Sequence, residues 1–546
     1  MTLNSPITPS VTASRDGILS RVSMGAAVTI FVALAYHFFN YVEDDPFITM
    51  RYAQNFWRGI GWVMNAGERV EGCTSPLHLW YDTLLLRFLT PDMTLLISKF
   101  LGLSLGTVLL FQTRALARAV FPGVTWLASL APLVIAISPR FALAMTNGLE
   151  TSIAATLWTG ALLAFCYELK TETRCHVKSA SLFALAALTR PEFFITFPLL
   201  LIIVQRKHQR WQNWTVYLLP LLAFEIFRLT YYHDFVPNTY WAKTIPLSAA
   251  LPMAIKYLRI QACPGGPQLG IVLALFGVWA LYRRSYAQEG RTVLIALAAH
   301  VVFILRVGGD WMVDGRFCNV VGATFGVLWL GAILQMCAYR NSLTITSTNG
   351  KPINGATRLL MDAVPVLIAL TLVIIAHVNI ARAVEVEINV HDMAYVLHAR
   401  PSLSRWRIAN PNGLLTVGDW LKANAKRGQT ALLSEIGLVP LTNPDIKVID
   451  CFGLTDRTIA HMPGYKRATG GVFCLRDWMR PGPLRDYIRK RRPECVALAW
   501  DDYVTDNMDN IQLSDAFYEP TGTFPMTTPF GYFTVATWRL RNTGPR

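Results

Sequence analysis

Apolar runs separated by short basic segments occupy the chain from Ser23 to Ile380, and this pattern constrains the fold more than any other feature. Hydrophobic residues make up 53% of the 546 positions and charged residues only 16%. A soluble protein of this length carries more charge, whereas an apolar run of about 20 residues is long enough to cross a lipid bilayer as a helix. The sequence therefore predicts a polytopic α-helical membrane protein.

The chain has a formal net charge of +15, and most of its clustered Lys and Arg residues lie in short loops, as at Arg114, Arg118 and Arg283-Arg284. This distribution is typical of the cytoplasmic loops of membrane proteins. No basic stripe is interleaved with aromatic residues, so the charge does not indicate a nucleic-acid partner. Taken as cytoplasmic, these loops place residues 1–22 inside and predict about 11 spans within residues 23–380.

The sequence changes character after Ala381, where charged and apolar residues alternate and no further span is apparent. The pattern predicts a helix at residues 414–425. It also predicts four strands, at residues 430–433, 446–449, 495–500 and 533–540. We therefore expect residues 381–546 to form an external α/β domain of ordinary size.

The nine cysteines form no Cys-x-x-Cys motif and no ligand-like spacing with histidine, so we expect no structural zinc site. Cys451, Cys474 and Cys495 share the external domain, where an oxidising environment would permit one disulfide. The sequence does not determine which pair would form it.

Three carboxylates, Glu43, Asp44 and Asp45, directly follow the first apolar run and precede Pro46. Acidic side chains at a membrane edge are costly to keep near lipid and are therefore functional candidates. A helix cap is the alternative, with Asp44 or Asp45 at the N-cap and Pro46 in the first turn. A cap needs only one acid, and a cap can also hold a catalytic carboxylate in place.

The apolar segment 180–205 has basic residues on both flanks, so both of its ends should lie inside. It contains Thr189-Arg190-Pro191-Glu192, where proline cannot continue the preceding helix. We therefore expect two half-length helices that enter and leave the membrane, with Arg190 and Glu192 at the break. The two charges either hold the break together as an ion pair or line a cavity, and the second interpretation is favoured because such charges are rarely retained without a ligand.

Several of these segments carry motifs that resemble those of GT-C membrane glycosyltransferases, and above all the terminal arabinofuranosyltransferase branch and its bacterial relatives. The resemblance is most specific in the first external loop, residues 42–76. It rests on Glu43-Asp44-Asp45, Arg51-Tyr52-Ala53, Asn55, Gly59, Gly61, Asn65, the run from Gly67 to Gly72, and Thr74-Ser75-Pro76-Leu77. Further matches are Asn147-Gly148-Leu149-Glu150-Thr151, Arg190-Pro191-Glu192, Pro237-Asn238-Thr239 with Ala242-Lys243, Gly308-Gly309-Asp310 with Arg316-Phe317, and Asp450 to His461. Two departures are His233, where glycine is usual, and Val313-Asp314-Gly315, where some relatives place a histidine.

The resemblance implies a GT-C fold and the transfer of a sugar, D-arabinofuranose in the arabinofuranosyltransferase branch, to a cell-envelope glycan or glycoconjugate. Loop charge places all the motifs on the outer face of the bacterial inner membrane. Nucleotide sugars are absent there, so the donor would be a polyprenyl-phosphate sugar. Such a transfer needs a carboxylate base for the acceptor hydroxyl and cations for the leaving phosphate.

We expect Asp44 to be the general base, with Asp45 orienting the acceptor or a metal. The residues expected to bind the donor phosphate or lipid are Arg190, Glu192, Arg228, Asn238, Lys243, Arg306 and Arg316. Those expected to bind the acceptor or support the site are Glu68, Glu71, Glu150, Asp310, Asp456 and His461. Glu150 would serve equally well as an acidic residue at a helix start. A divalent metal ion bridging Asp45 or Glu71 to the phosphate is also compatible with the sequence.

Two other functions use similar features. A transporter or flippase of lipid-linked glycan also has broken helices and buried charges, but no inverted repeat is apparent here and the acids gather at one face. A non-catalytic envelope or motility-assembly factor could share the same scaffold, although the intact Asp44 and Asp45 argue against it.

Overall fold

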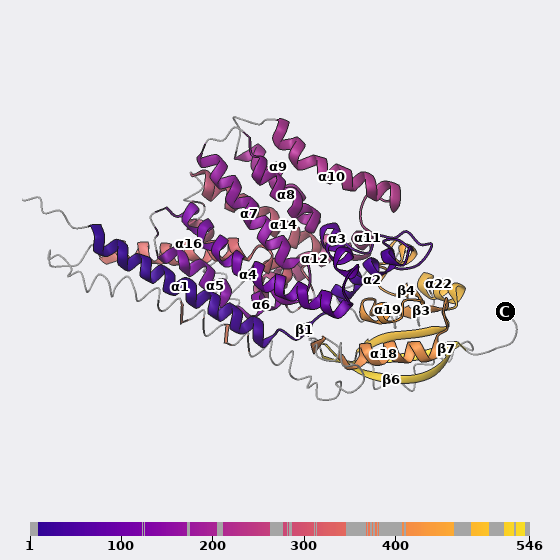
Figure 1. Cartoon of the computed structure of the whole chain (residues 1–546). Coiled ribbons are helices and arrows are strands. Elements are labelled where there is room, and N and C mark those ends of the chain that lie inside the picture. The colour runs from indigo at the N-terminus through magenta and orange to yellow at the C-terminus, as the bar shows by residue number, and fades with distance from the viewer. Residues whose placement is uncertain are drawn as a thin grey trace, which may run out of the picture.

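A computed structural model describes residues 9–122, 124, 126–171, 175–204, 211–261, 277–280, 282, 287–310, 312, 314–344, seven scattered residues between 367 and 381, 407–408, 411–462, 482–501, 518–528 and 531–540. Figure 1 shows a helical region at one end and an α/β domain, formed by the C-terminal part of the chain, at the other. The first loop, residues 42–76, lies at the junction of the two regions.

The helical region contains four helices that are long and apolar enough to cross a membrane, among the residues described above. They are α1 (Pro9–His37, apolar from Asp16), α4 (Pro91–Val120), α7 (Thr151–Lys170) and α14 (Gln288–Val307). A fifth candidate is a bent pair of helices. Its first member joins the 3-10 helix η1 (Leu127–Ser129) to α5 (Leu130–Ala136), its second member is α6 (Pro139–Thr146), and the two meet at an angle of 71°. These helices agree with the prediction of a polytopic helical membrane protein.

The predicted number of about 11 spans is not confirmed. The predicted spans at 269–281 and 359–380 lie largely outside the described residues. Helices α10 (Trp211–Tyr231), α12 (Leu247–Gln261) and α16 (Gly322–Thr344) complete the helical region. Helix α6 was not predicted; it begins at Pro139, and the Ser138 hydroxyl accepts a hydrogen bond from the Phe141 amide at 3.4 Å.

The predicted break in segment 180–205 is confirmed. Helix α8 (Val177–Thr189) ends at Arg190, whose backbone is extended. The 3-10 helix η2 (Pro191–Ile195) and helix α9 (Thr196–Ile203) then continue the chain. The proline ring is incompatible with continuing α8 but suits the first turn of a new helix.

The first loop and its flanks consist of strand β1 (Tyr41–Val42), helix α2 (Asp45–Trp57), a turn-rich segment and helix α3 (Pro76–Leu86). Gly61 has a φ of +104°, and a Cβ there would lie 2.2 Å from the hydroxyl of Tyr231 on α10. Glycine is therefore required for both the turn and the close packing of the loop against the helical region. A short helix α11 (Asn238–Lys243) follows α10 at the same end of the molecule.

The C-terminal domain contains a five-stranded sheet with the strand order β4-β3-β5-β7-β6. Four of its strands, β3 (Thr430–Leu433), β4 (Lys447–Asp450), β5 (Cys495–Asp501) and β7 (Gly531–Leu540), confirm the predicted strands, whereas β6 (Tyr518–Thr528) was not predicted. Strands β4, β3 and β5 are parallel, and β7 pairs antiparallel with both β5 and β6. The described residues of the domain also form helices α18 (Pro411–Asn424), α19 (Leu438–Thr442), α20 (Arg457–Ala460) and α22 (Pro483–Arg491). Cys451 and Cys495 are not joined by a disulfide, and Cys474 lies outside the described residues.

The first loop and the C-terminal domain share one hydrophobic core. Phe47 and Met50 of α2 belong to the same buried cluster as Val417, Leu433 and Leu438 of the domain. Strand β1 also pairs in parallel with β2 (Arg407–Ile408). Burial of apolar side chains from both segments fixes the carboxylates of the loop against the domain.

Candidate active site

Asp44 connects the first loop to the C-terminal domain. It occupies the N-cap position of α2, but its side chain does not cap that helix. Its two carboxylate oxygens accept hydrogen bonds from the backbone amides of Gly437 at 2.7 Å and Leu438 at 2.8 Å, at the start of α19. Asp44 is 6% exposed, and burial raises its pKa to about 6 although these two hydrogen bonds oppose the shift. We call Asp44, Gly437 and Leu438 the docking contact.

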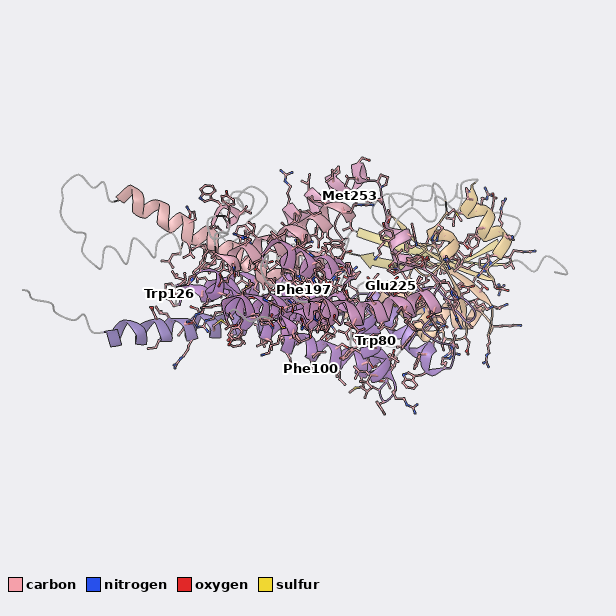
Figure 2. All side chains as sticks on the ribbon, turned by 90° about the horizontal axis from the view of Figure 1, so that it is seen from above. Trp80, Phe100, Trp126, Phe197, Glu225 and Met253 are labelled. Atoms are coloured by element: carbon pink, nitrogen blue, oxygen red, sulfur yellow. The ribbon has the colours of Figure 1, made fainter. Side chains whose placement is uncertain are left out.

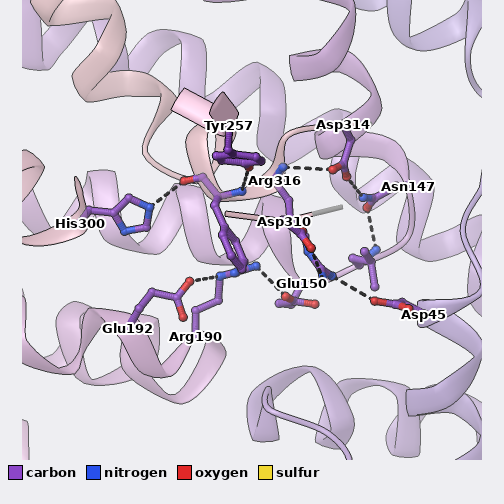
Figure 3. Close-up of polar contacts among 12 residues, drawn as sticks. Asp45, Asn147, Glu150, Arg190, Glu192, Tyr257, His300, Asp310, Asp314 and Arg316 are labelled. Atoms are coloured by element: carbon purple, nitrogen blue, oxygen red, sulfur yellow. Dashed lines mark hydrogen bonds and ion pairs between the residues drawn. The ribbon is translucent and has the colours of Figure 1, made fainter. Parts of the chain in front are cut away.

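Asp45 has different surroundings from Asp44, although the two residues are adjacent. Its side chain is 24% exposed, and one carboxylate oxygen accepts a hydrogen bond from Arg316 at 3.3 Å (Figure 3). Arg316 is buried and also forms an ion pair with Asp310. Asp45 is therefore held by a single long charge-assisted contact, and it remains partly accessible.

A second guanidinium group lies beside the first (Figure 3). Arg190, at the helix break, forms ion pairs with Glu150 at 2.9 Å and with Glu192. Burial alone would raise the pKa of Glu150, but the charges of Arg190 and Arg316 lower it below its ordinary value. Each of the two arginines is thus paired with two carboxylates. We call Asp45, Glu150, Arg190, Asp310 and Arg316 the arginine centre.

Asp314 fixes the turn that carries Arg316. It is fully buried, and its carboxylate accepts hydrogen bonds from the backbone amide of Arg316 at 3.0 Å and the side chain of Asn147 at 2.6 Å. Burial raises its pKa to about 6. Asp314 was not predicted as a site residue, because it stands in the segment where the sequence departs from the related motif.

A second charged network joins the loop to α10. Arg228 forms ion pairs with Glu71 at 2.7 Å and with Glu225. The side-chain amide of Asn238 donates to the backbone carbonyls of Gly453 at 2.7 Å and Leu454 at 3.0 Å. The backbone amide of Asn238 donates to the backbone carbonyl of Glu71. Asn238 therefore connects the helical region to the C-terminal domain, and Arg228 is neutralised by two acids.

The remaining predicted residues take varied places. Lys243 interacts electrostatically with Asp310 and so lies near the arginine centre. Arg306 donates to the Ile245 carbonyl at 3.2 Å. Glu68 pairs with Arg491 at 3.0 Å, Asp456 caps α20 through the Ile459 amide at 3.0 Å, and the His461 ring lies 5.0 Å from that of Trp241 on α11. Glu68 and Asp456 thus stabilise contacts of the C-terminal domain.

A metal ion bridging Asp45 or Glu71 to the phosphate stays a prediction, and each of these carboxylates already has an arginine partner. Asp45 is paired with Arg316, and Glu71 is paired with Arg228. Within the part of the chain that the structure describes, no group of three or more His, Cys, Asp or Glu side chains is arranged to hold a metal. The arrangement favours stabilisation of negative charge by guanidinium groups.

Two further carboxyl groups, the buried Glu43 and the half-buried Glu435, lie near Asp45. Glu43 accepts a hydrogen bond from Tyr41, and burial raises its pKa to about 8. Glu435, which precedes α19, also has its pKa raised well above the ordinary value by burial, with Asp44 and Asp45 adding to the shift. No sequence signal indicated Glu435, because it is brought to the first loop only by the docking of the domain.

Comparisons with known proteins agree with this architecture. Residues 403–543 match the family model "Domain of unknown function (DUF8728)". The chain is 29% identical over 320 residues to the terminal β-(1→2)-arabinofuranosyltransferase of Corynebacterium glutamicum, which covers 50% of this chain and 45% of the relative. It is 28% identical over 229 residues to the enzyme of the same name from Mycobacterium tuberculosis, covering 37% and 35%. The chain thus spans less than half the length of these curated relatives.

Two solved structures share the fold. One is the oligosaccharyltransferase AglB from Archaeoglobus fulgidus in complex with an inhibitory peptide and a dolichol-phosphate, with a TM-score of 0.55, 12% identity and coverage of 95% of this chain and 75% of the other. The apo form of the Archaeoglobus fulgidus oligosaccharyltransferase gives a TM-score of 0.52 at 14% identity, with coverage of 93% and 74%. The chain is therefore similar in sequence to terminal arabinofuranosyltransferases and has a membrane-embedded GT-C fold, as its motifs predicted.

Proposed function

We propose that this chain is a membrane glycosyltransferase that transfers a sugar from a polyprenyl-phosphate donor to a cell-envelope glycan. The observation that carries the proposal is the arginine centre, where a partly exposed carboxylate, Asp45, contacts a buried guanidinium group at 3.3 Å. The curated relatives support a glycosyl transfer, with D-arabinofuranose as the first sugar to test. The dolichol-phosphate in the complex of AglB supports a lipid-phosphate donor.

The base in this proposal is Asp45 and not Asp44. A general base must accept a proton on an oxygen that the acceptor hydroxyl can reach. Both oxygens of Asp44 already accept backbone hydrogen bonds from the C-terminal domain. Asp45 keeps part of its carboxylate exposed, and its contact with Arg316 is long enough to be exchanged. The sequence identified the pair of acids, and the geometry favours the reverse assignment of their roles.

The reaction then follows from the positions of the charged groups. Asp45 takes the proton of the acceptor hydroxyl. The oxygen of that hydroxyl forms a bond to the anomeric carbon of the donor sugar. The bond from that carbon to the phosphate oxygen breaks, and the electron pair leaves with the polyprenyl phosphate. Arg190 and Arg316 stabilise the charge that develops on this phosphate, as fixed cationic donors do in a buried site. When the phosphate binds Arg316, the contact with Asp45 is released and the base becomes free.

The orientation of the protein belongs to the same proposal. With the loop between the first two spans outside, the arginine centre and residues 381–546 face the periplasm of a bacterial inner membrane. Lys243 would add positive charge near Asp310, and Arg228 and Arg306 would support the donor site from its edge. The C-terminal domain would bind the acceptor glycan, with His461 beside α11.

A transfer assay with defined substrates tests the proposal. The full-length protein in nanodiscs is supplied with decaprenyl-phosphate arabinofuranose and a short arabinan acceptor, and the products are identified by mass spectrometry. We expect one added pentose and released decaprenyl phosphate. A nucleotide sugar in place of the lipid donor serves as the matched control and should give no product. Absence of transfer from every polyprenyl-phosphate sugar, with intact lipid-linked donor recovered, would contradict the proposal.

A further inference from the structure

Helix α3 carries polar side chains that are buried and lack hydrogen bonds. His78 is 2% exposed and Asp82 is 0% exposed, one turn apart on the same face. Neither nitrogen of His78 and neither oxygen of Asp82 has a hydrogen-bond partner, and their nearest approach is 3.8 Å. The hydroxyl of Ser75, one turn earlier, is also buried without a partner. Buried polar atoms are nearly always satisfied, so a set of five unsatisfied atoms on one face indicates a missing ligand or water.

This polar face lies beside the arginine centre. Glu150, which binds Arg190, is close enough to His78 and Asp82 for its charge to raise the pKa of each side chain. Thr151 follows Glu150 at the start of α7, and its buried hydroxyl also has no hydrogen-bond partner. Helix α3 packs against α8, which ends at Arg190. The unsatisfied atoms therefore come from two elements, α3 and α7, and both adjoin the proposed donor phosphate site.

The other side of α3 differs from this face. Pro76, Leu79 and Trp80 line a small aromatic pocket together with residues of α10, and the rings of Trp80 and Phe224 lie 6.1 Å apart. Figure 2 shows Trp80 and Glu225 in the part of the helical region nearer the C-terminal domain. Thr83, a polar residue of the same helix, has its hydroxyl satisfied by Trp62 at 3.0 Å and the Leu79 carbonyl at 2.7 Å. The lack of partners is thus a property of one face and not of the whole helix.

The chemistry of this face suits hydroxyl groups better than ions. Burial lowers the pKa of His78 and raises the pKa of Asp82 well above its ordinary value, so burial favours the uncharged form of both side chains. A neutral imidazole and a protonated carboxyl each offer one donor and one acceptor, and the hydroxyls of serine and threonine do the same. A phosphate would require cations and a metal ion would require carboxylates. A sugar ring presents hydroxyls that donate and accept in the same way.

We propose that Ser75, His78, Asp82 and Thr151 form a subsite that binds hydroxyl groups of the donor sugar, next to the phosphate held by Arg190 and Arg316. This inference rests on the proposed function and adds the group that selects the sugar. Water molecules filling the same space are the competing explanation. The two differ in one respect, because only a sugar subsite distinguishes a sugar-bearing lipid from the same lipid without its sugar.

Binding of two lipids to the full-length protein in nanodiscs tests the subsite. We measure the affinity for decaprenyl phosphate and for decaprenyl-phosphate arabinofuranose by native mass spectrometry, in the wild type and in Asp82→Leu and His78→Leu variants. We expect each variant to lose about tenfold or more in affinity for the sugar-bearing lipid, since unpaired polar contacts govern such discrimination. Affinity for decaprenyl phosphate should not change. Thr83→Val, on the same helix but outside the subsite, should leave both affinities unchanged.

Deoxy donors provide the second measurement, and its wild-type arm does not depend on the variants folding. The wild type should bind at least one monodeoxy analogue of the donor more weakly than the complete sugar, and Asp82→Leu should no longer make that distinction. Equal binding of all deoxy donors by the wild type would overturn the subsite and leave only water in it. Variants that retain the wild-type preference for the sugar-bearing lipid would also overturn it. If the wild type transfers sugar while either result is obtained, the proposed function stands and the subsite alone fails.

Discussion

The arginine centre and the docking contact are built around adjacent residues, yet they differ in almost every physical respect. At the arginine centre, Asp45 meets a side-chain cation at 3.3 Å and stays 24% exposed. At the docking contact, Asp44 is buried and accepts two backbone hydrogen bonds from the start of α19. We infer from this difference that the two neighbouring acids have separate roles. Asp44 holds the loop against the C-terminal domain, and Asp45 remains available for proton transfer.

The docking contact also links the position of Asp45 to the C-terminal domain. Asp44 and Asp45 share one backbone segment, so the amides of Gly437 and Leu438 restrict where Asp45 can point. The shared core of α2 with α19 and β3 adds apolar burial to these two hydrogen bonds. A domain that is distant in sequence therefore positions the proposed base. Each prediction below tests one side of this comparison.

The largest effect is expected at the arginine centre. Arg316→Lys keeps the positive charge but cannot contact Asp45 and Asp310 together as the planar guanidinium does. We expect the transfer rate to fall by about 10²- to 10³-fold, the range seen when one group that stabilises developing charge is removed. Arg228→Lys, in the network with Glu71 and Glu225, should cost far less. An Arg316→Lys protein as active as the wild type would contradict the role of this centre.

The next largest effect is expected at the docking contact. A Cβ added at Gly437 would lie 2.1 Å from the backbone oxygen of Asp44, so Gly437→Ala must displace α19 or the loop. We expect a loss of about 3 kcal/mol in stability, typical of overpacking at a close contact, together with reduced transfer. Gly482→Ala is the matched control, since a Cβ there meets nothing within 4 Å. Thermal melting in nanodiscs measures both, and equal melting temperatures would show that the contact does not constrain the fold.

A smaller effect is expected on the pH dependence of the stability of the folded protein. It involves Asp44 of the docking contact and Asp314, which holds the turn that carries Arg316. The pKa values of Asp44 and Asp314 are raised to about 6 in the folded protein from ordinary values of 3.8. The folded state therefore binds protons more readily than the unfolded state between these values, and stability falls as pH rises through about 6. Asp44→Asn and Asp314→Asn should each flatten this dependence, as measured by melting temperature between pH 4 and 7. Unaltered slopes in both variants would count against the buried carboxyls.

The smallest effect is expected at the edge of the C-terminal domain. Glu68 and Arg491 form an ion pair at 3.0 Å, but both side chains are about a third exposed. Exposed pairs contribute about 0–1 kcal/mol because water and salt screen them. Arg491→Ala should therefore change the melting temperature by a degree or two at most and leave transfer intact. A loss as large as that of Gly437→Ala would mean that this pair, and not the docking contact, holds the domain.

Much of the fold could be predicted from the sequence. Apolar length identified the long helices, proline identified the break at Arg190, and alternation identified four of the five strands of the large sheet. Strand β6 was not predicted because it carries Pro520, Gly522 and Pro525, which usually interrupt strands. It pairs only with β7, at the edge of the sheet, where these residues are tolerated.

The candidate site was only partly predictable. Local motifs indicated Asp45, Glu150, Arg190, Asp310 and Arg316, and the structure brings these five together. The roles of Asp44, Asn238 and Glu435 depend on contacts with residues more than 200 positions away, which a local pattern does not contain. His78 and Asp82 were overlooked because a helical face with two polar residues is ordinary until its burial is known.

The central claim is that Asp45 accepts the proton of the acceptor and that Asp44 holds the loop in place. The most direct measurement compares the single-turnover transfer rates of Asp45→Asn and Asp44→Asn with saturating donor, alongside their melting temperatures. Asp45→Asn should reduce the rate by about 10³-fold or more while melting like the wild type, since a lost general base affects only the chemical step. Asp44→Asn should melt at a lower temperature and retain a measurable fraction of the rate. The reverse pattern, with Asp44→Asn inactive but fully stable and Asp45→Asn active, would contradict the account.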